Sequence, residues 1–466
     1  MAATAGAVLV AAPSAGAAAT GTRAVASWSP APLGRMVAAP ARADTVTDAF
    51  GFWQTLGDTT LARLTEEALR ASPTAQQAEA RVRQARAARS QAVLDLVPEV
   101  SVAGGYTRQR IAEAAFGLAV PDRGLWDAEV RASWEIDVFG RLRRSLRGYG
   151  ELSASAGEDL RDVHRVLAAA VAGAYYELRG AEDQLRVAEQ NAENQRRTLQ
   201  LTRDRLEAGR GTEFDTERAR AQLSSTLAMI PTLESRVAAA RHRIGVLIGR
   251  EPQTLGAELT GGGAPLPSLP AALSLAEPDA LVRARPDVRA AERRLAAETA
   301  FVGAAKAEYL PRLNLGGTAG YTSTEFDGLT KSGSGRYAVG PVLTWPALNL
   351  GRVKAGVDAA RALEALAEAR YRQTVLLARE EVESGLVAYT KARERLARLE
   401  EAADASGRAA ELARLRFEGG VADFLQVLDA ERSMLAAQDQ LAQGRTEAVT
   451  ALVAVYRAVG QTDAIR

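Results

Sequence analysis

The sequence predicts a mainly α-helical chain that also carries strands of a membrane β-barrel, with one unit written twice along its 466 residues. Three observations lead to this fold class. Matching residues recur at a constant separation, short segments alternate strictly between apolar and polar residues, and long segments without proline carry apolar residues at heptad spacing. Each repeat is expected to supply two barrel strands and two long antiparallel helices, so one chain holds four strands.

The internal repeat is marked by prolines, tryptophans and glycines. Pro73 matches Pro286 at a separation of 213 residues, which holds until the strands begin. After the strand loops the separation becomes 211 residues, as for Trp134 with Trp345 and for the later glycines and arginines. A separation that holds through the strands and both long helices indicates a duplicated unit.

The chain divides where its composition changes. We expect a leader at 1–43, a first repeat at 44–250, a Gly- and Pro-rich linker at 251–278, a second repeat at 279–460 and a short tail at 461–466. The first 22 residues carry no charge, and Ala41-Arg42-Ala43 matches the A-x-A pattern of signal-peptide cleavage sites. The leader is therefore predicted to be an export signal, and a disordered low-complexity segment is the alternative.

The predicted strands alternate with a period of two. Residues 127–138 alternate throughout, with apolar residues at even numbers and Asp, Glu, Arg or Ser at odd numbers. Residues 100–106, 313–321 and 337–345 repeat the pattern, the last less regularly, and prolines should bend it. About ten residues suffice for a tilted strand to cross a bilayer. A soluble β-sandwich is the alternative, but the charged face suits a water-filled lumen better.

Aromatic residues are placed where the apolar face would meet the two membrane interfaces. Trp126 and Trp134 lie eight residues apart on one face, which corresponds to roughly 26 Å at about 3.3 Å per residue. That length is near the height of the apolar band of a membrane barrel. The predicted membrane-interface aromatics are Tyr106, Trp126, Trp134, Tyr321, Tyr337 and Trp345.

Four strands cannot close a barrel, and lipid tolerates no open sheet edge. Several chains must therefore share one barrel. Two chains would give about eight strands, whose interior fills with side chains, whereas three would give about twelve and leave a channel. The sequence thus predicts a homotrimer or larger.

The long helices are predicted from proline-free heptad patterns. The segment from Leu146 to Glu207 lacks proline, and a helix of about 60 residues spans roughly 90 Å. Its second half should form an antiparallel coiled coil with the helix that follows the turn, and Pro231 should kink that helix. The predicted seam comprises Leu178, Ala181, Leu185, Ala188, Ala192, Gln195, Leu199, Thr202 and Leu206, facing Ala219, Leu223, Thr226, Ile230, Leu233, Val237, Ala240, Ile244 and Leu247. The second repeat carries the same seam from Tyr389 to Phe417.

Composition argues against several function classes. The chain has no cysteine, which excludes disulfides, thiolate metal sites and a lipid-modified cysteine, and its two histidines, His164 and His242, lie far apart. We therefore expect no metal site, no cofactor and no enzyme active site. Basic and acidic residues number 58 and 57 and are interspersed, so no nucleic-acid-binding face is expected.

Three motifs carry a resemblance to a known family. Residues 133–141 read Ser-Trp-Glu-Ile-Asp-Val-Phe-Gly-Arg, residues 339–346 read Val-Gly-Pro-Val-Leu-Thr-Trp-Pro before Gly351-Arg352, and Arg416-Phe417-x-x-Gly420 leads to 428–432, Leu-Asp-Ala-Glu-Arg. Together with Phe52-Trp53, these resemble the outer-membrane efflux protein (TolC) family, in its NodT-like branch of RND-type efflux outer-membrane factors. The resemblance runs from about residue 52 to 460.

The resemblance implies a trimer with a twelve-stranded barrel in outer-membrane lipid and a twelve-helix tunnel that extends into the periplasm. It implies the channel of a tripartite efflux system for small molecules such as drugs, coupled through a periplasmic adaptor protein to an inner-membrane pump. An exit duct for protein secretion is the alternative with the same architecture. A soluble periplasmic coiled-coil adaptor is a further alternative, which the paired strands disfavour.

The turns after Arg205 and Arg416 are expected to form the periplasmic tip. Glycines in both turns allow a positive φ at a tight reversal, namely Gly209, Gly211, Gly419 and Gly420. By resemblance this tip meets the adaptor, through Arg205, Gly209, Arg416, Gly419 and Gly420. A structural turn without a partner is the alternative.

A channel gate is expected beside the second turn. Leu425, Asp429 and Arg432 fall at i, i+4 and i+7 on one helical stripe. By resemblance, Leu425 would form an apolar ring, Asp429 and Arg432 would link neighbouring helices, and Phe417 would belong to the same constriction. Phe417 equally fits the coiled-coil seam, and Asp429 with Arg432 equally fits a surface pair.

Overall fold

The computed structural model describes residues 58–110, 122–255, 259, 266–270 and 278–459, which all lie in one compact unit, Val46–Arg466. The predicted export signal, the Phe52-Trp53 pair, part of the linker and the tail at 461–466 lie outside the described residues.

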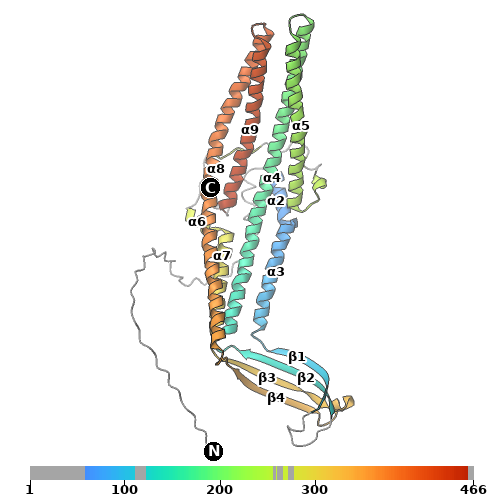
Figure 1. Ribbon diagram of the computed structural model, residues 1–466, viewed down its shortest axis with the longest axis vertical. Helices are drawn as coiled ribbons and strands as arrows, with labels where there is room; N and C mark the ends of the chain where they lie inside the picture. Colours follow the sequence, from blue (N-terminus) through green and yellow to red (C-terminus); the bar gives the residue numbers. More distant parts are fainter. Residues whose placement is uncertain (1–57, 111–121, 256–258, 260–265, 271–277, 460–466) are drawn as a thin grey trace, which may run out of the picture. The chain divides into compact units, whose positions relative to one another are not determined.

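The elements follow one another in the same order twice (Figure 1). The first set comprises α2 (Thr59–Ala71), α3 (Pro73–Leu94), β1 (Glu99–Gln109), β2 (Arg123–Ile136), α4 (Arg141–Glu207) and α5 (Glu213–Ile248). After the 3-10 turn η3 (Pro252–Leu255), the second set comprises α6 (Pro278–Ala284), α7 (Pro286–Ala307), β3 (Arg312–Ser323), the 3-10 turn η4 (Phe326–Thr330), β4 (Gly335–Thr344), α8 (Leu350–Glu418) and α9 (Phe424–Val459). Helices α4 and α8 contain 67 and 69 residues, so each is roughly 100 Å long.

Local sequence explains where several helices begin. The Asp58 carboxylate accepts hydrogen bonds from two backbone N–H groups in the first turn of α2. The Ser72 hydroxyl caps α3, whose first residue is Pro73, which has no N–H to satisfy there. Gly140 precedes α4 with a φ of 76°, a left-handed conformation that favours glycine.

Both helices that lead into strands end about one turn before a proline. Helix α3 ends at Leu94 and α7 at Ala307, and Pro98 and Pro311 follow. The Val97 N–H bonds to the Leu94 carbonyl, three residues back, so the chain leaves the α-helix through tight turns. Residues before a proline avoid the helical conformation, in keeping with helix ends at these places.

The strands form one antiparallel sheet in the order β1-β2-β3-β4. Across its register, Val130 lies opposite both Val102 and Ala319, and Ala319 lies opposite Tyr337. Directly opposed residues point to the same face, so the apolar alternations of all four strands share one face. Strands β1 and β4 are the two edges, and each offers a row of backbone groups to a further strand.

Strand β2 ends earlier than predicted, and the bend expected at the prolines of β4 stays a prediction. Strand β2 ends at Ile136, so Val138 lies beyond it, where its N–H bonds to the Ile136 carbonyl in a tight turn. Strand β4 continues through Pro341, which pairs with Leu315. An edge strand accommodates a proline because one side of it has no partner strand.

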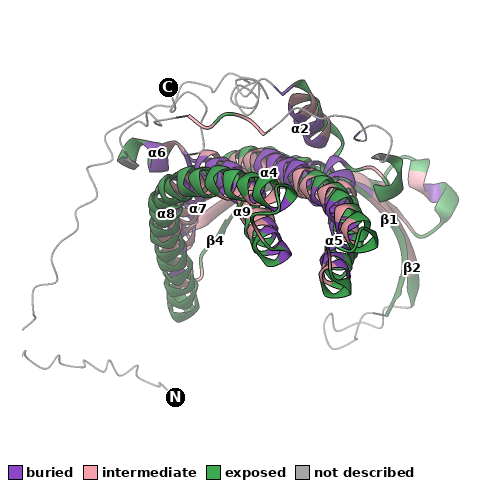
Figure 2. Cartoon of the chain, turned by 90° about the horizontal axis from the view of Figure 1, so that it is seen from above, coloured by how far each residue is buried: buried purple, intermediate pink, exposed green. Residues whose placement is uncertain are grey.

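Helices α3, α4, α5, α7, α8 and α9 form a single curved layer, seen end-on in Figure 2, and α2 and α6 lie against its outer side. Beside the sheet the layer runs α3, α4, α7, α8, and towards the tips it runs α5, α4, α9, α8. Helix α4 therefore has neighbours on both sides, whereas α8 lies at one border of the layer. A single layer has a thin core, in keeping with an aromatic content of 5%.

The coiled-coil seams are confirmed. The buried seam residues are Leu178, Ala188, Ala192, Gln195, Leu199 and Thr202 on α4, and Ala219, Leu223, Thr226, Leu233, Val237, Ile244 and Leu247 on α5. Ala181, Leu185, Ile230 and Ala240 are partly buried against this core, and only Leu206, in the last turn of α4, is exposed, at 36%. In the second repeat Tyr389, Ala392, Ala403, Ala410 and Phe417 are buried. Helix α5 is assigned without interruption through Pro231, and the expected kink stays a prediction.

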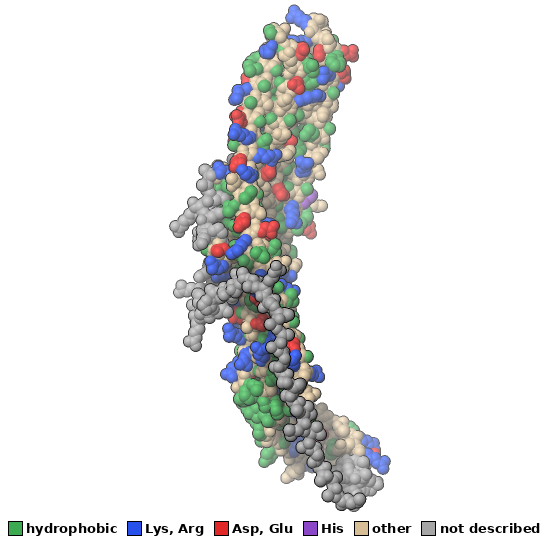
Figure 3. Space-filling view, turned by 60° about the vertical axis from the view of Figure 1, so that its left-hand side comes forward, with side chains coloured by type: hydrophobic (Ala, Val, Ile, Leu, Met, Phe, Trp, Pro, Cys, Tyr) green, Lys and Arg blue, Asp and Glu red, His purple; other side chains and the backbone are tan. Residues whose placement is uncertain are grey.

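The surface mixes both signs of charge along the helices, with a hydrophobic region where the helices approach the sheet (Figure 3). Within the described ranges, none of the helices is both long and apolar enough to cross a membrane.

Candidate functional site at the hairpin tips

The turns α4–α5 and α8–α9 close with the same backbone motif. The N–H of Gly209 bonds to the carbonyl of Leu206, and the N–H of Arg210 bonds to the carbonyl of Arg205. This is the Schellman pattern, which needs one left-handed residue, and Gly209 supplies it with a φ of 69°. Gly420, with a φ of 74°, holds the same place in the second turn.

The prediction of a positive φ at Gly211 and Gly419 is wrong. Gly419 is helical, with a φ of −73°. A Cβ atom on Gly211 would lie 3.1 Å from the Leu206 nitrogen, so close packing is what this glycine permits. One left-handed residue completes each Schellman motif, which leaves no need for a second.

Arg205 joins the two hairpins at their tips. Its Nη2 donates to the carbonyls of Phe417 and Glu418, at 2.6 and 3.1 Å, and its guanidinium lies 4.0 Å from the centre of the Phe417 ring. The acceptors are the last carbonyls of α8, so the cation also lies at the negative end of that helix. Arg416, at the matching place in the second repeat, is exposed, and its side chain forms no hydrogen bond or ion pair with the described residues.

A groove of about 730 Å³ lies between the two tips. Its lining comes from both hairpins and includes Phe214, Arg218, Asp423 and Leu425. Phe214 is 67% exposed and lies under the Arg218 guanidinium, 5.2 Å from the ring centre. An exposed aromatic ring in a polar groove provides an anchor for a protein partner.

The structure places the expected gate residues in different surroundings. Leu425 is 51% exposed, and Asp429 is also exposed. The Arg432 Nε donates to Gln222 Oε1 at 2.7 Å, so this side chain links α9 to α5. Phe417 is 7% exposed and packs against Phe424 and under Arg205, so its ring lies in the coiled-coil seam, which is one of its two predicted places.

The sequence did not predict a buried carboxylate that lies on α9 about two turns from the hairpin tip. Glu431 on α9 is 3% exposed and accepts hydrogen bonds from the Thr198 hydroxyl on α4 and from Arg414 on α8, each at 2.9 Å. Further along the same interface, the Asn191 amide donates to Gln438 at 2.9 Å. Together these bonds fasten α4 to the second hairpin. Glu431 falls next to an apolar seam position, and that is the only signal by which sequence could have found it.

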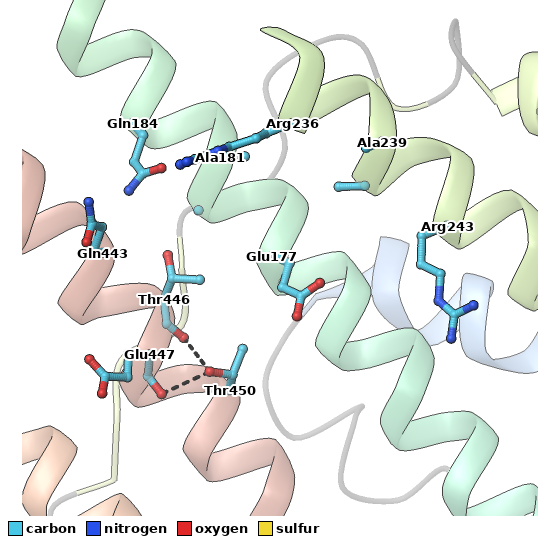
Figure 4. Close-up of a pocket in the computed structure, with 12 residues that line it drawn as sticks. Glu177, Ala181, Gln184, Arg236, Ala239, Arg243, Gln443, Thr446, Glu447 and Thr450 are labelled. Carbon is cyan, nitrogen blue, oxygen red and sulfur yellow. Dashed lines mark hydrogen bonds between the residues drawn. The ribbon is translucent and has the colours of Figure 1, made fainter. Parts of the chain in front are cut away.

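A second groove, of about 670 Å³, lies midway along the layer between α5 and α9 (Figure 4). Its floor is formed partly by Gly180 on α4, where an added Cβ would lie 2.0 Å from the Thr446 hydroxyl oxygen. Charged residues of both signs line it, namely Glu177, Arg236, Arg243 and Glu447. Among the described residues, no group of His, Cys, Asp or Glu side chains could hold a metal ion.

The polar face of the sheet carries a network of charges. Arg336 on β4 forms ion pairs with Glu129 at 2.6 Å and Asp127 at 3.3 Å. The Thr322 hydroxyl donates to Asp127 at 2.6 Å and accepts from Arg336. Glu129 also pairs with Arg131. This face thus holds its charges in pairs, opposite the apolar face.

Four of the six predicted interface aromatics lie towards the two ends of the sheet. The rings of Tyr106 and Trp126 lie 4.8 Å apart at the end distant from the helices. Trp134 donates its indole N–H to the Leu96 carbonyl at 2.9 Å, and Trp345 donates in the same way to Tyr309 at 3.0 Å. The remaining two, Tyr321 and Tyr337, are 52% and 85% exposed.

Comparison with known proteins agrees with this architecture. The outer membrane efflux protein family matches residues 64–250 and 278–461. The toluene efflux pump outer membrane protein TtgF of Pseudomonas putida is 33% identical over 367 residues, which span 78% of this chain and 75% of the relative. The pyoverdine export outer membrane protein OpmQ, also of Pseudomonas putida, is 32% identical over 419 residues, spanning 88% of this chain and 87% of the relative. The solved outer-membrane channel OprN superposes with a TM-score of 0.82 at 38% identity, covering 88% of this chain and 92% of OprN.

Proposed function

The chain belongs to the outer membrane efflux protein family, and from this premise we propose that it is the outer-membrane duct of a tripartite efflux pump. Three copies share a twelve-stranded barrel in the outer membrane and a helical tunnel in the periplasm. A periplasmic adaptor protein connects their tips to an inner-membrane pump. The duct performs no chemistry and needs no cofactor.

The proposal rests on two features: the sheet has unpaired edge strands, and the helical layer ends at α8 without a covering helix. The sheet has one apolar face, one charged face and two unpaired edges. In lipid, such edges require further strands. The charged face, with Arg336 paired to Glu129 and Asp127, suits a water-filled lumen.

Small molecules are the substrate class that the relatives support. The names of two of them refer to toluene efflux and pyoverdine export. Those names favour small-molecule efflux over protein secretion, the alternative with the same architecture. We infer that the adaptor and pump select the substrate, and that this chain provides the passage.

We infer that the adaptor occupies the groove between the tips. Phe214 and Leu425 offer it exposed apolar surface, while Arg218 and Asp423 offer charges of opposite sign. Of the residues expected from the sequence to meet the adaptor, Arg205, Gly419 and Gly420 line this groove, and Gly209 supplies the left-handed residue of the first turn, whereas Arg416 lies outside the lining.

We further infer that the tunnel mouth is narrowed by Leu425, Asp429 and Arg432. The first two are exposed, as a lining residue must be, and Arg432 already ties α9 to α5. Phe417 supports the mouth from within the seam.

The test is complementation of a bacterium that keeps its own adaptor and pump but lacks its outer-membrane channel. Expression of this chain should restore resistance to toluene and reduce dye accumulation, and the rescue should disappear when the pump gene is deleted. Failure to rescue, with the chain present in the outer membrane, would count against a role in small-molecule efflux.

A matched pair of variants tests the membrane faces in the same cells. Val130, on the apolar face, is 44% exposed, and Ser133 belongs to the charged face. Arginine at mid-bilayer destabilises a barrel by about 2–4 kcal/mol, so Val130→Arg should lower the amount of folded channel. The Ser133→Arg chain should still restore resistance. Equal effects at both positions would overturn the assignment of faces.

A further inference from the structure

Two arginines end the two longest helices, and only one of them has a partner among the described residues of its own chain. Arg205 at the end of α4 donates to the last carbonyls of α8 and lies over the ring of Phe417. Arg416, which the 211-residue repeat places at the same position of α8, has no such partner among the described residues. We propose that Arg416 donates to the Leu206 and Glu207 carbonyls at the end of α4 in the next copy of the chain. This inference rests on the proposed assembly of several copies.

The order of the helices brings these groups together. Near the tips the layer runs α5, α4, α9, α8, so the next copy continues it with its own α5 and α4 beside α8. Each repeat thus meets the following one in the same order, within a chain and between chains. The contact that Arg205 makes to the second hairpin is repeated when Arg416 turns to the first hairpin of the neighbour.

The acceptor end of α4 is free to receive a cation. The Leu206 carbonyl accepts only backbone N–H groups of its own turn, and no side chain in the described part of the chain donates to the Glu207 carbonyl. Leu206 is 36% exposed, although Phe417, its match in the second repeat, is buried under Arg205. Terminal carbonyls of a helix carry the negative end of its dipole and favour a nearby arginine.

The link between copies should be weaker than the link within a chain. Within the chain, Arg205 is supported by the Thr198–Glu431 and Asn191–Gln438 bonds. On α8 the residues that match Thr198 and Asn191 are Ala409 and Ala402, which cannot form such bonds. Leu206 also lacks the aromatic face that Phe417 gives to Arg205. Of these three polar contacts, only the arginine contact can recur between copies. The hairpin tips should therefore separate between copies before they separate within one chain.

Cross-linking tests the geometry, because the chain has no native cysteine. One double variant, Glu207→Cys with Arg416→Cys, should give covalent dimers and trimers on a denaturing gel with a short bismaleimide. The matched pair Arg205→Cys with Glu418→Cys should link within one chain and stay at monomer size. A chain that is trimeric by light scattering but gives no intermolecular product from the first pair would overturn the inference. A monomeric chain would instead overturn the proposed assembly.

Channel recordings test the energetics. Leu206→Phe would give Arg416 the aromatic platform that Arg205 already has, and a cation–π contact at an exposed site shifts an equilibrium by about two- to fivefold. The ratio of closed to open channels in planar bilayers should therefore rise by this factor, and the rise should vanish when Arg416→Ala is added. An equal rise with and without Arg416 would mean that the ring acts through another contact and would overturn the proposal.

Discussion

Helices α4 and α8 are the same element of two repeats, yet their own chain covers them differently. Helix α4 packs against α2, α3, α5, α7 and α9, whereas α8 packs chiefly against α6, α7 and α9. Ser155 and Tyr176 on α4 are 2% and 1% exposed. Their matches on α8, Leu366 and Val387, are 45% and 62% exposed. The same helix face therefore occurs in both repeats. Within one chain, the face on α4 is covered and the face on α8 is not.

The uncovered face of α8 is apolar along much of its length. Its large exposed side chains are Leu363, Leu366, Leu376, Leu377, Val387, Leu412 and Leu415. Burial of one such side chain contributes about 1.5–3 kcal/mol, and a long exposed apolar stripe marks an interaction surface. Where α4 meets its neighbours through hydrogen bonds as well as apolar contacts, α8 offers mainly apolar surface to the next copy.

The largest effect should come from Arg285, which precedes the proline at the start of α7. Ser72 holds the matching place before α3. Arg285 is 2% exposed and donates to Asp287, Glu381 and the Ala458 carbonyl, so it ties α7, α8 and α9 together. Removal of one member of a buried ion pair costs about 3–5 kcal/mol, and Arg285→Ala should destabilise the detergent-solubilised protein by this amount in denaturant titrations followed by circular dichroism.

The matching residue in the first repeat is the control. Ser72 only caps α3, through the Thr74 N–H at 3.3 Å, and loss of such a cap costs about 0.5–2 kcal/mol. If Ser72→Ala and Arg285→Ala destabilise equally, the two repeats are not fastened as differently as their contacts indicate.

The next effect concerns assembly. Val387→Asp would place a carboxylate on the apolar face of α8 and should cost about 2–4 kcal/mol per interface, since a buried unpaired charge adds to the lost apolar burial. Light scattering in detergent should show loss of the trimer while the helical circular dichroism signal remains. Val387→Thr, which adds no charge, should retain the trimer at higher protein concentration. A fully trimeric Val387→Asp variant would show that this face is not the seam between copies.

Glycine substitutions distinguish a covered helix from an uncovered one. Gly180→Ala on α4 would force a Cβ against the Thr446 side chain, and overpacking of this kind costs about 1–3 kcal/mol. Gly407 on α8 has no atom within 4 Å of an added Cβ, so Gly407→Ala should stabilise by about 0.5–1 kcal/mol through helix propensity. Thermal melting of both variants checks the opposite signs, and melting shifts of one sign would contradict the comparison.

Sequence alone could predict the parts of the molecule that repeat a simple period. The one-faced sheet and the seam around Leu178 and Ile244 follow from periods of two and of three to four. The polar contacts of Arg205, Arg285 and Glu431 could not be predicted, because each joins helices whose order in the layer only the fold supplies. Phe417 was assigned two roles for the same reason, since its seam position was visible but the guanidinium that covers it was not.

Acid should weaken the second repeat through Asp287. Burial alone would raise the pKa of this carboxyl, but the hydrogen bonds and charge of Arg285 outweigh burial and hold the pKa below its usual range. A carboxyl whose pKa is lowered in the folded state stabilises the protein at neutral pH and loses that contribution as pH falls through the lowered value. The stability difference between the native chain and Asp287→Asn should therefore shrink as pH falls below about 4. A difference independent of pH would mean that Asp287 acts through its shape alone.

The smallest effect should come from the exposed links at the tunnel mouth, where the two hairpins differ most. Arg432 ties α9 to Gln222 on α5, whereas the first hairpin has Ala221 at the matching place. Links in contact with water contribute about 0.2–1 kcal/mol each, so an adaptor that favours the open state by a few kcal/mol can break them. Asp429→Ala with Arg432→Ala should therefore raise single-channel conductance in planar bilayers without loss of the trimer. Arg218→Ala, at the position that matches Asp429 in the first hairpin, serves as the control and should conduct like the native channel. If the double variant also conducts like the native channel, the constriction is formed by other residues.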